Sequence, residues 1–335
     1  MSSSGVRFSV RVNNDLGFAG LLALAEAAEQ AGFDQLWVSN DLFLRSAPVL
    51  TGALAARTGR ISLGISIMNP YSVHVSELAM AAATVQEVSG GRFLLGLGAG
   101  AEQFLGWAGI ARSRPLATTR TALVVLRTLL GHRDVDASLL PEWFGPDSVL
   151  RFGMPRPVPV YIGAMGPKML EMAGRHADGV LPLLYPPERY ATVRQQVLAG
   201  AATRPGRGEV DLPACFWVSL SGDPAAARAA LAEKLAYYGP SIPAAVLAGS
   251  GLRPQDFAPA AELAHGGRGA AALIDDRMLS LGVAGDVTDV LARCRALTRL
   301  GASHLSFGPP LGPDPVAAVR LLGDQVLPAL QDANA

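Results

Sequence analysis

The chain has 335 residues, of which 50% are hydrophobic and 17% are charged, and this balance predicts a folded globular protein and excludes a disordered one. Its 28 basic residues match its 28 acidic residues and are interspersed with them, so no basic stripe is present and we expect no nucleic-acid partner. No stretch predicts a membrane span, and the start MSSSGVRFSV lacks the features of a secretory signal, so we expect a cytoplasmic protein with no membrane partner.

Short β-rich runs alternate with helical stripes along the whole chain, which is typical of parallel βα units. Residues 6–12 alternate as a first strand, and residues 21–28 carry the apolar stripe of a helix that ends at Gly32. The other strands are expected at 35–38, 61–65, 92–97, 158–162, 179–183, 212–220 and 304–307. The helices between them are expected at 48–57, 78–85, 115–130, 169–176, 187–201, 225–238, 287–300 and 316–330.

Two segments interrupt this alternation. Residues 134–152 predict an excursion that a hairpin would fit, and residues 239–276, rich in Pro, Gly and small side chains, predict a mostly helical insertion after the seventh strand. The sequence therefore favours an α/β protein with a single domain over residues 1–335, a (β/α)₈ TIM barrel with one insertion. A two-domain arrangement is the alternative.

The segments that follow the expected strands are rich in small and polar residues, and in a barrel these segments form the ligand site. They read SNDLFLR, SIMNPYS, GLGAGAE, GAMGPKM and GPPLGP. Glycines let a backbone approach a flat ligand, and a helix that begins near Pro167 offers free N–H groups to an anion. The pattern predicts a planar, phosphorylated cofactor, although glycines that merely end strands account equally well for any single loop.

Several other chemistries find no support. The run Gly96–Ala101 matches a dinucleotide fingerprint, but no Asp or Glu occurs from Gln103 to Arg133 to hold a ribose. The five histidines lack metal-ligand spacing, and the two cysteines are expected to be buried thiols. With no G-x-S-x-G motif and no P-loop, we expect no metal site and neither a hydrolase nor a phosphoryl transferase.

Long stretches of the chain resemble the luciferase-like monooxygenase superfamily. They are GFDQLWVSND, MNPYSVHVSELAMAAATVQEVSGGRFLLGLGAG, PLATTRTAL, VPVYIGAMGPKMLEMAGRHADGVL and GASHLSFGPPLGPDP. Within the superfamily they are most similar to the branch that contains methylenetetrahydromethanopterin reductase and uses the deazaflavin coenzyme F420. The resemblance implies a (β/α)₈ barrel with the deazaflavin across the strand ends, a small-molecule substrate and a homodimer.

The family's cofactor contacts, transferred position by position, fall on four segments at the strand ends. They are Asn40; Ser66, Ile67, Met68 and Asn69; Gly98, Ala99, Gly100 and Ala101; and Gly163, Ala164, Met165 and Gly166. The resemblance also implies a non-prolyl cis peptide between Ser66 and Ile67, forming a bulge behind the central ring. Lys168 at a helix start is predicted to meet a phosphate, with a solvated surface charge as the alternative.

Two departures from the family bear on the substrate. The methanopterin reductase has an acidic residue in the first strand and another after the fourth strand, and these positions here are Arg11 and Ala101. The Asp-His pair that follows the second strand in many relatives is here Asn40-Asp41. These replacements argue against methanopterin and favour hydride transfer to a C=N or activated C=C bond of another small metabolite.

Two residues at these altered positions, Asp41 and Arg11, are the first catalytic candidates. We expect Asp41 to donate a proton and Arg11 to anchor the substrate, because arginine keeps its charge and binds carboxylates through two hydrogen bonds. Either residue could instead be a structural salt-bridge partner. Tyr71, His74 and Glu102 are weaker candidates. Two other functions stay open: a monooxygenase that uses reduced flavin mononucleotide (FMN), and a noncatalytic deazaflavin-binding protein.

Overall fold

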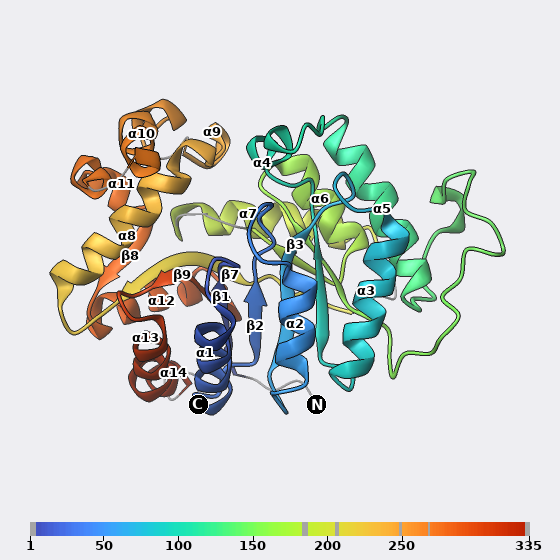
Figure 1. The fold of residues 1–335 in the computed structure, drawn as a ribbon, viewed down its shortest axis with the longest axis horizontal. Coiled ribbons are helices and arrows are strands. Elements are labelled where there is room, and N and C mark those ends of the chain that lie inside the picture. Colours follow the sequence, from blue (N-terminus) through green and yellow to red (C-terminus); the bar gives the residue numbers. More distant parts are fainter. Residues whose placement is uncertain (1–4, 183–186, 205–207, 248–249, 267–268, 332–335) are drawn as a thin grey trace.

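A computed structural model describes residues 5–182, 187–204, 208–247, 250–266 and 269–331. Nine parallel strands form one curled sheet in the order β6-β5-β4-β3-β2-β1-β9-β7-β8 (Figure 1). The strands are β1 (Arg7–Val12), β2 (Gln35–Val38), β3 (Ser62–Met68), β4 (Phe93–Leu97), β5 (Val160–Gly163), β6 (Gly179–Leu181), β7 (Ala214–Leu220), β8 (Gly282–Gly285) and β9 (His304–Leu311).

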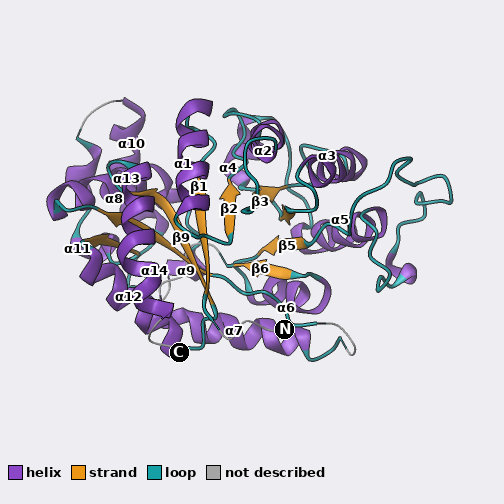
Figure 2. Ribbon diagram, turned by 90° about the horizontal axis from the view of Figure 1, so that it is seen from below, coloured by secondary structure: helices purple, strands orange, loops and turns teal. Residues whose placement is uncertain are grey.

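Helices surround the strands on the outside (Figure 2). In chain order they are α1 (Phe18–Gln30), α2 (Ala47–Ala55), α3 (Val75–Val88), α4 (Glu102–Trp107), α5 (Pro115–Leu129), α6 (Pro167–His176), α7 (Pro187–Ala201), α8 (Pro224–Tyr238), α9 (Ala244–Leu247), α10 (Ala258–Gly266), α11 (Asp276–Leu279), α12 (Val287–Arg299), α13 (Pro315–Leu321) and α14 (Leu327–Gln331). None of the helices in these ranges is long and apolar enough to cross a membrane.

The predicted alternation of parallel βα units is confirmed. The predicted closed barrel of eight strands is wrong, because the sheet has nine strands and its edges are β6 and β8. The sequence misses β8, because its residues GVAG have little strand propensity. β8 pairs with the upper part of β7, on the edge that a closed barrel would offer to β6. Within the described ranges, β6 meets the chain before β7 only at one bridge, where the Val180 N–H donates to the Asp211 carbonyl at 2.8 Å.

Three further expectations can be compared with the structure. The insertion at 239–276 is mostly helical, as predicted: it contains α9, α10 and three short 3₁₀ turns, and α11 begins at its last residue. The excursion at 134–152 contains a 3₁₀ turn, Ala137–Leu139, and no hairpin. The closing helix is split into α13 and α14 by a π-helical turn, Leu322–Val326.

The inside of the sheet is filled by side chains, so it is not a pore. A cluster of inward-facing residues lies at mid-height: Trp37, Leu94, Tyr161, Leu181 and Cys215. The other face of each strand contributes to the larger core under the helices. Cys215 and Cys294 are both buried and unpaired, as expected.

The amino-terminal end of the sheet is closed by a buried polar chain. His304 Nδ1 lies 3.0 Å from Asp211 Oδ1, and its Nε2 lies 2.9 Å from Ser9 Oγ. Arg7 and the Tyr161 hydroxyl also donate to Asp211, at 2.5 and 2.8 Å. Burial alone would raise the pKa of Asp211, but His304, Arg7 and Tyr161 together hold it down at about 2.

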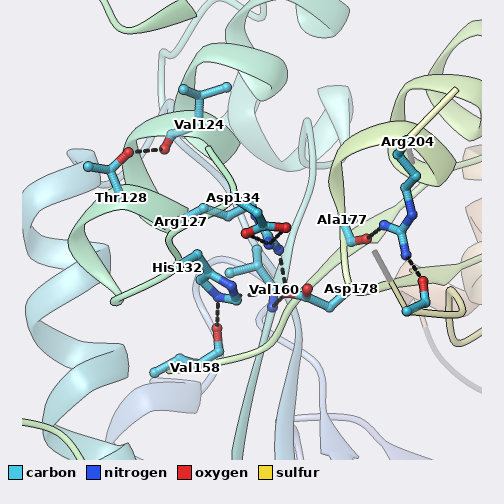
Figure 3. A network of polar contacts seen from close by, with 11 residues as sticks. Val124, Arg127, Thr128, His132, Asp134, Val158, Val160, Ala177, Asp178 and Arg204 are labelled. Atoms are coloured by element: carbon cyan, nitrogen blue, oxygen red, sulfur yellow. Dashed lines mark hydrogen bonds and ion pairs between the residues drawn. The ribbon is translucent and has the colours of Figure 1, made fainter. Parts of the chain in front are cut away.

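A second polar network lies at the amino ends of β5 and β6 (Figure 3). Arg127, on α5 and only 3% exposed, donates to Asp178 at 2.6 Å and to Asp134 at 2.9 Å. Asp178 also accepts the Val160 N–H at 2.8 Å. The network attaches α5 and the start of the 134–152 excursion to the sheet, at the end opposite the predicted ligand loops, so its role is structural.

Candidate functional site

The carboxyl ends of β3, β4 and β5 form the first part of the site. β3 contains a cis peptide between Ser66 and Ile67, as the resemblance implies, and its register with β4 shifts between Ile65 and Met68. This bulge places the half-buried Ile67 against the inward-facing cluster.

Glycines on the neighbouring strands make room for that side chain. A Cβ atom at Gly98 would lie 3.1 Å from Ile67 Cδ1, and one at Gly163 would lie 2.9 Å from Ile67 Cγ2. The first partner of these glycines is therefore Ile67, a role that the sequence interpretation did not foresee. Side chains at the two glycines would therefore displace Ile67 from the strand ends.

The start of α6 borders this surface. Gly166 caps the helix and Pro167, which has no N–H, begins it. The N–H groups of Met169 and Leu170 donate to the Gly166 carbonyl at 3.0 Å, which leaves the Lys168 N–H as the backbone donor for an anion. Lys168 is exposed, and no ion pair to it occurs in the described ranges. This placement fits both the phosphate role and the surface-charge alternative.

Some predicted cofactor residues lie at the carboxyl ends of the strands, which form the rim of the curled sheet, and others lie below this rim. Met165 and Gly166, like Ala99 and Gly100, are half-buried at the strand ends, and Ala101 is exposed.

The side chains of Met68 and Ala164 point away from the inside of the sheet, towards the helices. Their side chains are 5% and 2% exposed and belong to the core under the helices, where Met68 lies near Leu78 of α3. Contact with a cofactor at these two positions can therefore involve only the backbone.

Asn40 and Asn69 have local structural partners. Asn69 Oδ1 accepts the N–H groups of Tyr71 and Ser72 at 3.0 and 2.9 Å, which shapes the turn after β3. Asn40 Oδ1 accepts the Ala47 N–H at 3.4 Å, at the start of α2. These contacts define the loops, and direct cofactor contact by either amide stays a prediction.

Arg11 lies inside the sheet, below the rim. It is 4% exposed, its Nε donates to Ser306 Oγ at 3.0 Å, and one terminal nitrogen donates to the Phe216 carbonyl at 3.0 Å. Burial lowers the pKa of its guanidinium. These contacts to β7 and β9 favour a structural role with neutral partners over the substrate-anchoring role, which stays a prediction.

Asp41 lies at the end of β2 and is the centre of a polar cluster. Its Oδ2 accepts the Tyr238 hydroxyl at 3.0 Å and lies 3.5 Å from Ser39 Oγ. The Tyr238 oxygen in turn accepts Asn13 Nδ2 at 3.0 Å. Burial raises the pKa of the Asp41 carboxyl, against the opposing effects of Tyr238 and Lys234.

Lys234 is a functional candidate that the sequence analysis missed. It lies one turn before Tyr238 on α8, with its Nζ 4.0 Å from the centre of the Tyr238 ring and 6.0 Å from that of Trp217. Burial lowers the pKa of this ammonium to about 8, although Asp15 and Asp41 oppose the shift. Its rarity was the available signal, because only two lysines occur in this arginine-rich chain.

The weaker candidates have other partners. The Tyr71 hydroxyl donates to the Ser113 carbonyl at 2.6 Å, His74 caps α3, and Glu102 pairs with Arg112 at 2.6 Å. In the part of the chain that the structure describes, no three His, Cys, Asp or Glu side chains gather to hold a metal ion.

Comparisons with known proteins agree with this geometry. The family described as luciferase-like monooxygenase matches residues 4–304. The 5,10-methylenetetrahydromethanopterin reductase of Methanolobus tindarius is 32% identical, over 90% of this chain and 94% of that protein. The F420-dependent glucose-6-phosphate dehydrogenase of Nakamurella multipartita is 29% identical, over 99% and 98%. Among solved structures, the coenzyme F420-dependent tetrahydromethanopterin reductase of Methanopyrus kandleri superimposes with a TM-score of 0.83 at 26% identity, over 97% and 99% of the two chains.

Proposed function

We propose that this chain, which belongs to the luciferase-like monooxygenase family, is an oxidoreductase that uses the deazaflavin coenzyme F420. The similar proteins over nearly full length include reductases and a dehydrogenase, and two of them carry F420 in their names. A reduced deazaflavin donates a hydride, so the protein's own residues must seat the ring, position the acceptor and supply a proton.

The observation that carries the proposal is the surface at the ends of β3, β4 and β5. Ser66 and Ile67 would support the ring from below, and the missing Cβ atoms of Gly98 and Gly163 make room for Ile67 in that position. The start of α6, with Lys168, would hold the phosphate of the coenzyme.

The acceptor site in this proposal lies beside Asp41. We expect a C=N or activated C=C bond of a small metabolite there, because Asp41 and its partner Tyr238 form a group that can hold and release a proton. Arg11 and Ala101 stand where the methanopterin reductase has acidic residues, which argues against methanopterin as the substrate.

Coenzyme binding is the first test. Under anaerobic conditions, titration with F420 and separately with FMN, followed by fluorescence, is expected to show tight binding of F420 alone. Gly163→Val is expected to weaken F420 binding at least about tenfold, because the new side chain displaces Ile67 into the ring site. Gly106→Ala, on α4 with no atom within 4 Å of the new Cβ, is the matched control.

The outcomes separate the three functions. Selective binding of reduced FMN would contradict the proposal and favour the monooxygenase. Tight F420 binding without oxidation of the reduced coenzyme by any C=N or C=C acceptor in a broad panel would favour the noncatalytic binder.

A further inference from the structure

Lys234 occupies an unusual position among the charged groups of the candidate acceptor site. Its ammonium lies on the face of the Tyr238 ring, and the hydroxyl of the same ring donates to Asp41. The tyrosine therefore stands between the two charges: the cation contacts its π face and the carboxylate accepts a hydrogen bond from its hydroxyl. Lys234 and Tyr238 are four residues apart on α8, so both side chains lie on one face of that helix.

The Lys234 ammonium is held against two aromatic rings. No hydrogen bond or ion pair to Lys234 occurs in the described ranges, and its close neighbours are the rings of Tyr238 and Trp217. A half-buried lysine held by aromatic faces leaves its N–H donors free and feels nearby charges through a medium of low polarity.

The charges around this cluster come from three elements. Asp15 follows β1, Asp41 follows β2, and Arg11 lies below them inside β1; α8 contributes Lys234, with Tyr237 beside Tyr238. Asp15 is exposed, and solvent screens its effect. Asp41 is the carboxylate that is joined to Lys234 through the Tyr238 ring.

We propose that Lys234 is a positioning residue of the acceptor site, which acts through the Tyr238 ring to keep Asp41 charged and hydrogen-bonded until a substrate arrives. The role rests on the proposed function of Asp41 as the proton-handling group. When an acceptor takes the place of the tyrosine hydroxyl, Asp41 loses one hydrogen-bond donor, which favours uptake of a proton from solvent for delivery to the acceptor. The ammonium favours the charged carboxylate and opposes that uptake, so Lys234 helps to set when Asp41 holds a proton.

The test uses the fact that the chain has only two lysines. Protein grown with ¹³C-labelled lysine gives two sets of side-chain NMR signals, one from Lys234 and one from Lys168, and Lys168→Met assigns them. A pH titration then follows Lys234 directly, with Lys168 as the internal reference, in the absence of coenzyme and substrate.

Coupling to Asp41 predicts a specific response. Asp41→Asn removes the negative charge that favours the ammonium, so the pKa of Lys234 is expected to fall by about one unit while the Lys168 signal is unmoved. Tyr238→Phe keeps the ring and removes the hydroxyl, and is expected to produce a smaller shift. Asp136→Asn, which replaces an exposed aspartate on the 134–152 excursion, is the matched control and should change neither signal.

The reciprocal measurement is made on the carboxyl. Lys234→Met is expected to raise the pKa of Asp41, followed with ¹³C-labelled aspartate, by the same amount as Asp41→Asn lowers that of Lys234, because the coupling free energy is shared by both sites. Unchanged Lys234 titration in Asp41→Asn, with the fold intact by circular dichroism, would overturn the proposal. The coenzyme-binding test fails or succeeds independently of this result, so the two proposals are separable.

Discussion

At the scale of single residues, the site depends on side chains whose surroundings change their chemistry. Asp41 is the clearest case, because burial raises its pKa while Tyr238 and Lys234 favour its charged form. Burial thus makes this carboxyl a weaker acid than an exposed aspartate, and so more able to hold a proton for general acid catalysis.

Asp41→Asn is therefore expected to lower turnover by roughly 10² or more, since an amide cannot supply the proton. F420 binding should stay within about twofold of the wild type, because the proposed ring seat lies on β3, β4 and β5. Single-turnover oxidation of reduced F420 by an acceptor measures the first quantity and fluorescence titration the second. Turnover that equals the wild type would remove Asp41 from the role.

Asp211 contributes to the pH dependence of stability. Its pKa in the folded protein is about 2, below the usual value of an aspartate, so its contribution to stability is present above about pH 4 and is lost as the pH falls towards 2. Asp211→Asn is expected to reduce the free energy of unfolding at pH 7 by about 2 kcal/mol and to flatten its acid dependence.

Urea unfolding at pH 7 and pH 3 checks this prediction. Asp147→Asn, at an exposed position of the excursion, is the control and should change the free energy of unfolding by less than about 0.5 kcal/mol. A steep loss of stability between pH 4 and pH 3 that persists in Asp211→Asn would contradict the assignment.

The limits of sequence prediction are visible at this scale. Lys168 was predicted from its place at a helix start, whereas only the fold places Asp41, Tyr238 and Lys234 together. Asp41 and Tyr238 are 197 residues apart in the sequence, so no local spacing could connect them. Arg11 was selected by its chemistry, while its neutral partners inside the sheet depend on the register of β7 and β9.

At the scale of elements, the predicted bounds of one strand and one helix are those observed. β2 (Gln35–Val38) and α7 (Pro187–Ala201) have the predicted limits. Two elements, β8 and α4, have weak patterns and were missed: β8 is stabilised by pairing with β7, and α4 is only six residues long. Tertiary contacts decide such segments, and these contacts are not visible in local propensity.

α6 and α7 cross at glycines, which makes their packing sensitive to a single methyl group. A Cβ at Gly174 would clash with the Val197 carbonyl, and one at Gly200 would clash with the Glu171 carbonyl. Gly174→Ala is expected to lower the free energy of unfolding by about 2 kcal/mol or more, because the helices must separate.

Gly20→Ala on α1 is the matched control. Its new Cβ would have no atom within 4 Å, so the higher helix propensity of alanine is expected to raise stability by about 0.5–1 kcal/mol. Chemical unfolding followed by circular dichroism measures both variants. Equal effects of the same sign would show that the helix crossing is not tight.

At the scale of the whole molecule, the sheet is weakest where its two ends meet. β6 and the chain before β7 share one bridge at Gly179 and Asp211, while β8 occupies the upper edge of β7. We expect the Val180 amide to exchange with deuterium at least about tenfold faster than that of Val10, which lies between paired strands. Hydrogen exchange followed by NMR checks this, and equal protection would indicate a fully closed barrel.

The homodimer stays a prediction, and exposed apolar residues on neighbouring helices support it. Val49 of α2 is 71% exposed, and Met80 and Val88 of α3 are 46% and 50% exposed. Analytical ultracentrifugation is expected to give twice the mass of the chain, and Val49→Glu should shift the equilibrium towards monomer. Leu198→Glu, a similarly exposed apolar position on α7, is the matched control, and an equal shift in both variants would place the interface elsewhere.

The buried chain of Ser9, His304 and Asp211 has a wider meaning. In the order of its groups and in its distances it resembles the machinery of a serine hydrolase, yet Ser9 and His304 have no exposed surface. The distances among these three residues, taken alone, would therefore suggest hydrolysis of a peptide or an ester. Here the three groups have a structural role. The buried Ser9 hydroxyl cannot meet a substrate, and the hydrogen bonds join β1, β9 and the chain before β7.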